Sequence, residues 1–258
     1  MTNSDHRHTL AAWEDYQKTP WGRLFYTVEQ ANLLRHLDAP PCEVLDVGGG
    51  NGLDAIFLAR QGYDVALLDP DPAMLGSAQR LAASTDVAVR VQCYEGDITH
   101  LPSQFEGKRY DVVLCHNVLQ YVEDATVAIA NVCSLLADGG MVSLICGNRY
   151  AESYTAALQR FDLKAALEDL DLVARESLVL AKAINLYTVG DILPLLESAR
   201  CMLIKHYGIR CVTDYISDNH LKHDETFFNH LERLEQAISD RYPYYLLARY
   251  FQLIARKS

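Results

Sequence analysis

The sequence predicts an α/β fold built on a doubly wound, mostly parallel sheet. Short apolar segments alternate with helical ones between residues 43 and 146, and parallel strands need such long crossovers. The first apolar segment runs into four glycines within five positions, residues 48–52. Glycine there allows a sharp strand-to-helix turn and a close approach of the main chain to a ligand. Half of the 258 residues are hydrophobic, so we expect a sizeable core.

The first half of the chain is expected to supply five strands and the helices between them. An aromatic helical segment over residues 10–37, broken near Pro20, precedes the first strand. The expected strands are 43–47, 63–68, 87–93, 111–115 and 141–146. The expected helices are 55–62, 73–83 and 125–138. Gly139 and Gly140 are interpreted as a helix stop directly before the fifth strand.

The second half of the sequence predicts a helical insertion and two more strands. Residues 151–175 are read as helical and placed over the carboxyl ends of the sheet, and a helix is expected at 189–199. Strands at 201–212 and 246–255 would flank a helix with one apolar face, formed by Phe227, Leu231, Leu234 and Ile238. We expect a single domain, residues 1–258, with seven strands. Its parts are an N-terminal helical lid (1–41), a cofactor-binding core (42–147), the insertion (148–187) and the C-terminal part of the sheet (188–258).

The composition of the chain restricts the kinds of partner that it is expected to bind. The formal net charge is −11 and no run is rich in lysine or arginine, which argues mildly against a nucleic-acid substrate. No apolar window is long enough for a membrane span, and the amino terminus is polar. We therefore expect a cytoplasmic protein without membrane contact. The seven cysteines are odd in number and form no CxxC pair, so neither disulfides nor a metal site are predicted. The oligomeric state is left open.

Ligands of doubly wound sheets bind outside the carboxyl ends of the strands. At that edge we expect Gly48, Gly49 and Gly50 to pass under the amino-acid end of a cofactor, with Asp46 ending the first strand. Asp69, at the end of the second strand, can accept both hydroxyls of a ribose. The chain has no phosphate-binding lysine beside these glycines. The pattern thus favours a cationic nucleoside, and we infer S-adenosylmethionine.

Four further residues complete this predicted donor site. Met74 would lie against the adenine, Asp97 would accept its amino group with the Ile98 amide nearby, and His116 would face the methyl group. Each has a purely structural alternative. Asp69 alone could be a helix cap, Asp97 a turn acid, and His116 a packed histidine under the sheet edge. NAD is disfavoured because the last glycine falls one position too early for G-x-G-x-x-G.

Residues 45–52, 68–75, 96–98 and 135–140 resemble the motifs of class I S-adenosylmethionine-dependent methyltransferases. The resemblance covers residues 42–146 and implies the Rossmann-like methyltransferase fold. Residues 46–50, 115–122, 148, 208–210, 214–215 and 247–257 are also similar to the bacterial tRNA 5-carboxymethoxyuridine methyltransferase family, whose enzymes methylate a carboxylate on a wobble uridine. An arginine in that family's amino-terminal segment contacts the methyl donor, which makes Arg23 a candidate clamp for the methionine carboxylate.

The resemblance implies O-methylation of a carboxylate, either 5-carboxymethoxyuridine in tRNA or a small molecule. A carboxylate is already ionised at neutral pH, so it needs no general base. Donors for such an acceptor are expected beyond the fifth and sixth strands and in the insertion: Arg149, Tyr150, Tyr187, Arg210 and Tyr215. Two alternatives stay open. The chain could be a small-molecule N- or O-methyltransferase with His116 as catalytic base, or a non-catalytic S-adenosylmethionine-binding partner subunit.

Overall fold

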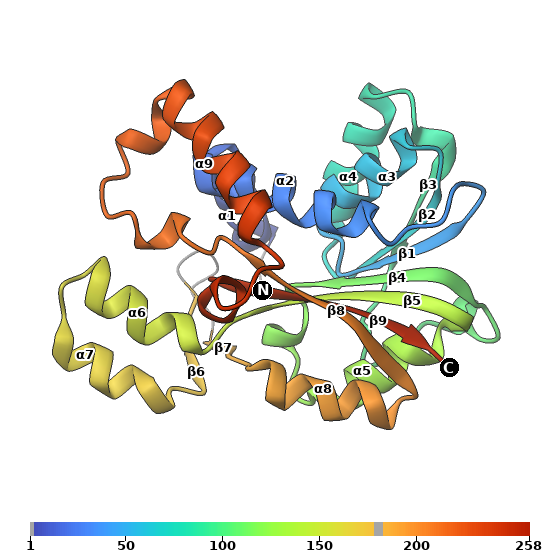
Figure 1. Cartoon of the computed structure of the whole chain (residues 1–258). Helices are drawn as coiled ribbons and strands as arrows, with labels where there is room; N and C mark the ends of the chain where they lie inside the picture. The colour runs from blue at the N-terminus through green and yellow to red at the C-terminus, as the bar shows by residue number, and fades with distance from the viewer. Residues whose placement is uncertain (1–2, 178–182) are drawn as a thin grey trace.

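The computed structural model describes residues 3–177 and 183–258, and its centre is a seven-stranded sheet (Figure 1). The strand order is β3-β2-β1-β4-β5-β9-β8. β9 pairs antiparallel with both neighbours, and the pairs among the first five strands are parallel. The strands are β1 Glu43–Val47, β2 Asp64–Asp69, β3 Val91–Glu95, β4 Tyr110–His116, β5 Leu136–Gly147, β8 Cys201–Ile209 and β9 Tyr250–Lys257. The strand order reverses between β1 and β4, which is where such sheets bind ligands.

Both faces of the sheet are buried, so its central strands are apolar on both sides. In β1, Val44 packs on one face, whereas Leu45 and Val47 pack on the other. The first face is covered by α2 (Pro20–Leu34), α3 (Leu53–Arg60) and α4 (Pro72–Ser84), and the second by α5 (Ala125–Ser134) and α8 (Val189–Ser198) (Figure 1). The predicted doubly wound fold is confirmed.

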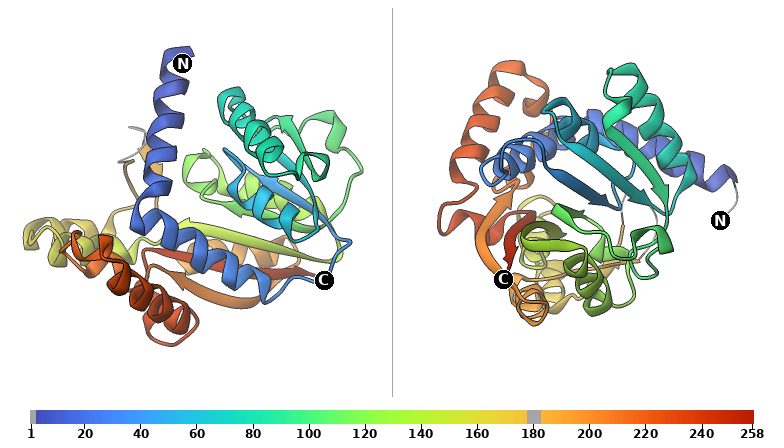
Figure 2. Two further views of the ribbon diagram at one scale, coloured as in Figure 1. Left: turned by 90° about the horizontal axis from the view of Figure 1, so that it is seen from above. Right: turned by 90° about the vertical axis from the view of Figure 1, so that its right-hand side faces the viewer.

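The amino-terminal segment forms two helices, and the break between them lies at Pro20, as predicted. α1 (Asn3–Lys18) ends before Thr19, whose side chain accepts a hydrogen bond from the Gly22 amide, and Pro20 opens α2. Proline is favoured at a first helical position because its missing N–H would have no partner there. Figure 2 shows α1 extending beyond the body of the sheet, with the N-terminus at its outer end.

The insertion after β5 is only partly helical. It contains α6 (Tyr150–Leu158) and α7 (Leu163–Glu168), as expected. It also contains an antiparallel pair, β6 (Ala174–Glu176) and β7 (Ala183–Asn185), where no strand was predicted. Residues 178–182 of the expected insertion lie outside the described part. The missed strands are three residues long, too short to produce a readable alternation.

Several predicted boundaries are wrong for local reasons. The helix expected to reach residue 138 ends at Ser134, because β5 already begins at Leu136. The Gly139-Gly140 pair therefore lies within that strand, beside the shift in register that separates the Tyr110–Leu136 pair from the Val112–Met141 pair. β3 starts at Val91, after a short 3-10 turn, β8 ends at Ile209 and β9 starts at Tyr250.

The buried face of α9 (Glu225–Ile238) keeps two of its four expected residues, Leu231 and Ile238, and replaces the other two by their neighbours. Phe228 is buried against α2, whereas Phe227 is only half-buried and Leu234 is exposed. Glu235 takes the inward position between Leu231 and Ile238 although it is charged. Its carboxylate accepts hydrogen bonds from the amides of Cys211, Val212 and Thr213 and from the Thr213 hydroxyl, at 2.6–2.9 Å. This buried acid fixes the turn after β8.

Glu235→Gln should lower stability markedly. The amide keeps one acceptor oxygen but turns its NH₂ toward the Cys211 amide, leaving a buried donor unpaired. We expect a loss of about 2–3 kcal/mol and a fall in melting temperature of roughly 5–10 °C, measured by calorimetry. Glu232→Gln, three residues earlier on α9 and partly exposed, is the matched control. Equal melting temperatures for the two variants would contradict the assigned role.

Candidate functional site

The turn after β1 presents main-chain atoms at its surface, and two of its glycines leave no room for a side chain. Gly48 has φ +65°, and a Cβ there would lie 2.4 Å from Val118 Cγ2; a Cβ on Gly49 would lie 2.5 Å from Asp46 Oδ2. Gly50 also has a positive φ, of +56°, but a Cβ there would meet nothing within 4 Å. The turn is thus closed toward the protein and open on the side of Gly50.

Two buried acids flank this turn. Asp69 Oδ2 accepts from the Gly50 amide at 2.9 Å and Oδ1 from the Asp71 amide at 2.8 Å, so the acid ties the turn to the end of β2. Burial raises the pKa of Asp69 to about 6. Burial and the neighbouring Asp54 and Asp69 raise the pKa of Asp46 well above its usual range. Asp46 Oδ2 has no hydrogen-bond partner among the described residues.

The other predicted donor contacts lie along the same edge with different exposures. Met74, on α4, and Ile98 are both buried. Asp97 is exposed, and its Oδ1 accepts from the amide and hydroxyl of Thr99 at 2.7 Å each. The predicted contact with adenine would use the second oxygen, Asp97 Oδ2. Through Oδ1, Asp97 also stabilises its own turn, which is the structural alternative considered for it.

His116 is a packed side chain in this structure. Its Nδ1 lies 3.1 Å from Asp54 Oδ2 and its Nε2 lies 2.8 Å from Ser143 Oγ. The side chain is 7 % exposed, and it is not among the residues that line the cavity described below. Because both ring nitrogens already have partners, the geometry does not support the predicted role as base.

Glu29, Asp54 and His116 form a buried group beneath the turn. Each offers one ligand atom, and these atoms all lie within 4.8 Å of one another, a spacing that a metal ion could use. A proton on Glu29 would offset the repulsion between the two acids just as a metal ion would. Burial and the adjacent Asp54 raise the pKa of Glu29 well above its usual range. Burial alone would also raise the pKa of Asp54, but the contacts around it, including the hydrogen bonds from His116 and Gln30, leave that pKa lowered.

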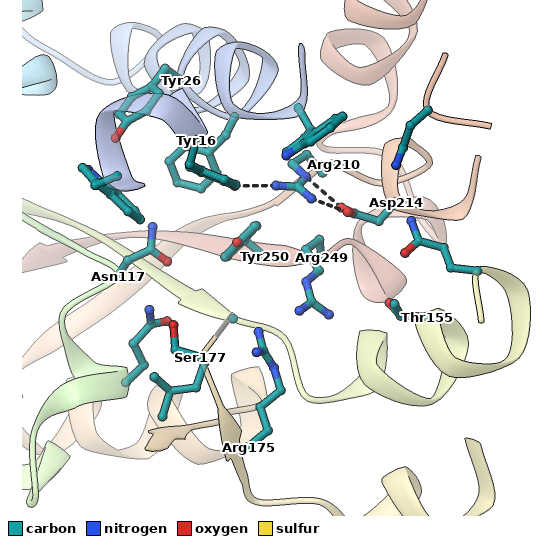
Figure 3. Close-up of a pocket in the computed structure, with 18 of the residues that line it drawn as sticks. Tyr16, Tyr26, Asn117, Thr155, Arg175, Ser177, Arg210, Asp214, Arg249 and Tyr250 are labelled. Carbon is teal, nitrogen blue, oxygen red and sulfur yellow. Dashed lines mark hydrogen bonds and ion pairs between the residues drawn. The ribbon is translucent and has the colours of Figure 1, made fainter. Parts of the chain in front are cut away.

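A cavity of about 360 Å³ opens beside this edge, between α1, α2, the insertion and the starts of β9 and of the loop after β8 (Figure 3). Its wall is mainly aromatic and cationic. The aromatic residues are Trp13, Tyr16, Trp21, Phe25, Tyr26, Tyr121 and Tyr250. The cationic residues are Arg175, Arg210, Lys222 and Arg249, and the acid is Asp214.

The four cations are held in different ways. Arg210 forms an ion pair with Asp214, donates to the Tyr16 hydroxyl at 2.6 Å, and lies over the Tyr250 ring. Figure 3 shows it between Tyr16 and Asp214. Lys222 is 2 % exposed and donates to Asn219 Oδ1 at 2.8 Å. Burial lowers the pKa of Lys222.

Arg249 and Arg175 share one carboxylate. Glu152, on α6, places Oε1 2.8 Å from Arg175 Nε and 3.0 Å from Arg249 Nη1. Arg249 Nη1 is close enough to Glu152 for an ion pair but does not form a hydrogen bond with it. This Nη1 is therefore a buried donor without a hydrogen-bond acceptor among the described residues. In Figure 3 the two guanidinium groups point toward one another. The pair can therefore accept a further anion.

The lid helix α1 contacts both the turn and the cavity. Gln17 exchanges two hydrogen bonds with Asn51, at 2.9 and 2.7 Å, directly after the glycines. Ser77 on α4 donates to Glu14 at 3.0 Å, and Tyr16 accepts from Arg210. The predicted lid thus lies across the two halves of the site.

Of the five predicted acceptor contacts, only Arg210 lines the cavity. Arg149 pairs with Asp191, Tyr150 is 57 % exposed, and the Tyr187 and Tyr215 hydroxyls donate to main-chain carbonyls. Arg23 is exposed, lies 4.7 Å over the Phe228 ring and is not among the residues that line the cavity.

Sequence reasoning missed Arg175, Lys222 and Arg249. Arg249 could have been found, because it directly precedes Tyr250 in the C-terminal segment that carried the resemblance. Arg175 belongs to the unpredicted β6, and Lys222 to a short 3-10 turn, so neither position had a readable signal.

Comparison with known proteins agrees with this geometry. A family model described as a methyltransferase domain matches residues 44–140. The tRNA 5-carboxymethoxyuridine methyltransferase of Escherichia coli (strain K12) is 27 % identical over 252 residues, which cover 95 % of this chain and 94 % of the relative. The ubiquinone biosynthesis O-methyltransferase of Rickettsia felis is 32 % identical over 136 residues, 53 % of each chain. An S-adenosylmethionine-dependent methyltransferase from Mesorhizobium loti has a similar structure, with a TM-score of 0.61, 20 % identity, and coverage of 89 % of this chain and 98 % of that one.

Asp69→Ala should weaken the binding of S-adenosylhomocysteine at least tenfold. The substitution removes a carboxylate expected to accept two ribose hydroxyls, and charge-assisted hydrogen bonds are the stronger kind. Isothermal calorimetry gives the affinity directly. An unchanged dissociation constant would contradict the ribose contact.

The affinity of the wild-type protein for S-adenosylhomocysteine should also fall in acid. With a pKa of about 6, Asp69 is ionised at pH 7.5 and largely protonated at pH 5. Only the ionised form accepts from both hydroxyls, so binding should weaken about tenfold over this range. Asp69→Asn cannot titrate, so its affinity should be flat between these pH values; a parallel fall in that variant would assign the effect to another group.

Proposed function

We propose that this chain, an S-adenosylmethionine-dependent methyltransferase, O-methylates a carboxylate bound in the aromatic, cationic cavity. The observation that carries this proposal is that two guanidinium groups of the cavity wall, Arg249 and Arg175, share a single buried carboxylate, that of Glu152. Two cations against one acid leave room for a second anion, and a carboxylate is the natural complement of a guanidinium. These cations are gathered in the cavity of a chain whose net charge is −11.

The arrangement suits a reaction that needs orientation rather than proton transfer. S-adenosylmethionine supplies an electrophilic methyl carbon on a sulfonium. In this proposal the glycine turn, Asp69 and the acids around it hold the donor, while Arg249 and Arg175 hold the acceptor so that one carboxylate oxygen faces that carbon. The acceptor is already ionised at neutral pH, so no residue has to remove a proton. The lid over both halves would exclude water.

We favour 5-carboxymethoxyuridine in tRNA as the first acceptor to test, with a small-molecule carboxylate as the alternative. Support comes from the relative of that name, which aligns over nearly the whole chain. The many rings in the cavity wall also suit a base or another planar acceptor. The absence of lysine- or arginine-rich runs in the sequence favours the small molecule.

The experiment is methyl transfer from radiolabelled S-adenosylmethionine to two cellular fractions, bulk tRNA and small molecules. A carboxyl methyl ester releases its label as methanol in mild alkali, whereas N-methyl and ether groups do not. We expect alkali-labile radioactivity in one fraction, and that fraction identifies the acceptor class. Alkali-stable label would contradict carboxylate methylation, and unlabelled fractions would point to a binding subunit.

Arg249→Met should raise the KM for the acceptor at least tenfold and leave the affinity for S-adenosylhomocysteine nearly unchanged. The substitution keeps much of the side-chain volume but removes the charge that would hold the acceptor. Steady-state kinetics with the labelled fraction gives the KM. Arg256→Met, an exposed arginine of β9, the strand that begins directly after Arg249, is the matched control. A normal acceptor KM in the Arg249 variant would remove Arg249 from the acceptor site.

A further inference from the structure

A continuous chain of buried polar side chains runs beneath the glycine turn. His116 Nε2 lies 2.8 Å from Ser143 Oγ, which accepts from Gln252 Nε2 at 3.1 Å. Gln252 Oε1 accepts from Asn32 Nδ2, and Asn32 Oδ1 accepts from the Ser239 hydroxyl, both at 3.1 Å. Ser143, Gln252, Asn32 and Ser239 are 0 % exposed. The chain therefore joins β4, β5, β9, α2 and the end of α9 without solvent.

The upper end of this chain reaches the donor-binding edge. His116 Nδ1 contacts Asp54, which lies in the first turn of α3 directly after Gly52. Gln30 Nε2 donates to the other Asp54 oxygen at 2.9 Å. Glu29 Oε2 lies 3.7 Å from His116 Nδ1, and Glu29 is fully buried. Asp54 is thus the point where the polar chain meets the turn.

One helix supplies two members of this network, Gln30 and Asn32, and places Glu29 beside them. Glu29, Gln30 and Asn32 lie on the second half of α2, and the first half of the same helix carries Trp21, Phe25 and Tyr26 into the cavity wall. Apolar side chains would bury this interface without desolvating so many polar groups. Directional hydrogen bonds, however, allow only one register of α2 against the sheet. The network therefore sets the distance between the turn and the cavity wall.

We propose that His116 is a positioning residue, which acts through Asp54 to hold the donor-binding turn of α3 in register with α2 and hence with the acceptor cavity. The inference rests on the donor lying at the glycine turn, as proposed above, but not on the identity of the acceptor. It gives His116 a function that uses both ring nitrogens as they are observed, in place of proton transfer.

The test separates the two hydrogen bonds of His116. In His116→Asn the amide can donate from near the Nδ1 position and keep the Asp54 contact, whereas His116→Phe keeps the ring volume and loses both contacts. We expect the affinity for S-adenosylhomocysteine to stay within threefold of wild type for the Asn variant and to fall five- to tenfold for the Phe variant. Thr27→Val on α2, outside the network, is the control.

Amide hydrogen exchange supplies a readout that a general loss of packing would not produce. In the wild type, S-adenosylhomocysteine should slow exchange both in α3 and in residues 20–34 of α2. In His116→Phe at saturating ligand, α3 should still be protected while the protection of α2 is lost. If His116→Phe does not fold, Gln30→Met removes a different donor from Asp54 and should give the same separation.

Each outcome decides the proposal. Ligand-induced protection of α2 that survives in the Phe variant, or in Gln30→Met, would overturn the positioning role. Equal affinity losses for the Asn and Phe variants would overturn it as well, because they would show that the Asp54 contact is irrelevant. Normal binding in Asp69→Ala would instead show that the donor site itself was assigned wrongly.

Discussion

The contact between the Gly50 amide and the Asp69 carboxylate, 2.9 Å long, links the two strands on which the donor half of the site is built. It holds the turn after β1 against the end of β2, while Gly48 and Gly49 leave no space for a side chain toward the protein. The open side of the turn is then main chain and carboxylate, the surface that a nucleoside with a cationic sulfur requires. The lid contact from Gln17 and the buried chain below Asp54 both attach to this same edge.

Charge is divided sharply between the two halves of the site. Asp46, Asp54, Asp69 and Glu29 are buried together under the turn, and at Asp46 and Asp69 burial raises the pKa. A ligand carrying a sulfonium and an ammonium complements such a group. The adjacent cavity holds four cations against few acids. A negative net charge for the whole chain therefore says little about the sign of the potential at the acceptor position.

Much of the fold and the donor half could be predicted from the sequence, because both depend on local patterns. The predicted first strand matches the observed β1, and the acids after β1 and β2 lie where their positions placed them. The acceptor half was mostly missed. Its three missed cations, Arg175, Lys222 and Arg249, come from β6, a 3-10 turn and the residue before β9, places that only tertiary packing brings together. Arg23 and Tyr150 have exposed side chains and do not line the cavity, so the roles expected for them stay predictions.

Glu152 gives the insertion a particular evolutionary meaning. Glu152 lies on α6 and Arg175 on β6, so one continuous segment supplies both a cation of the cavity wall and the buried carboxylate that pairs with it. Replacing that segment would change the shape and charge of one wall at once, without touching the strands that carry the glycine turn. Diversification of acceptors among enzymes of this architecture can thus proceed by exchanging a module of a few dozen residues, while the donor half is inherited intact.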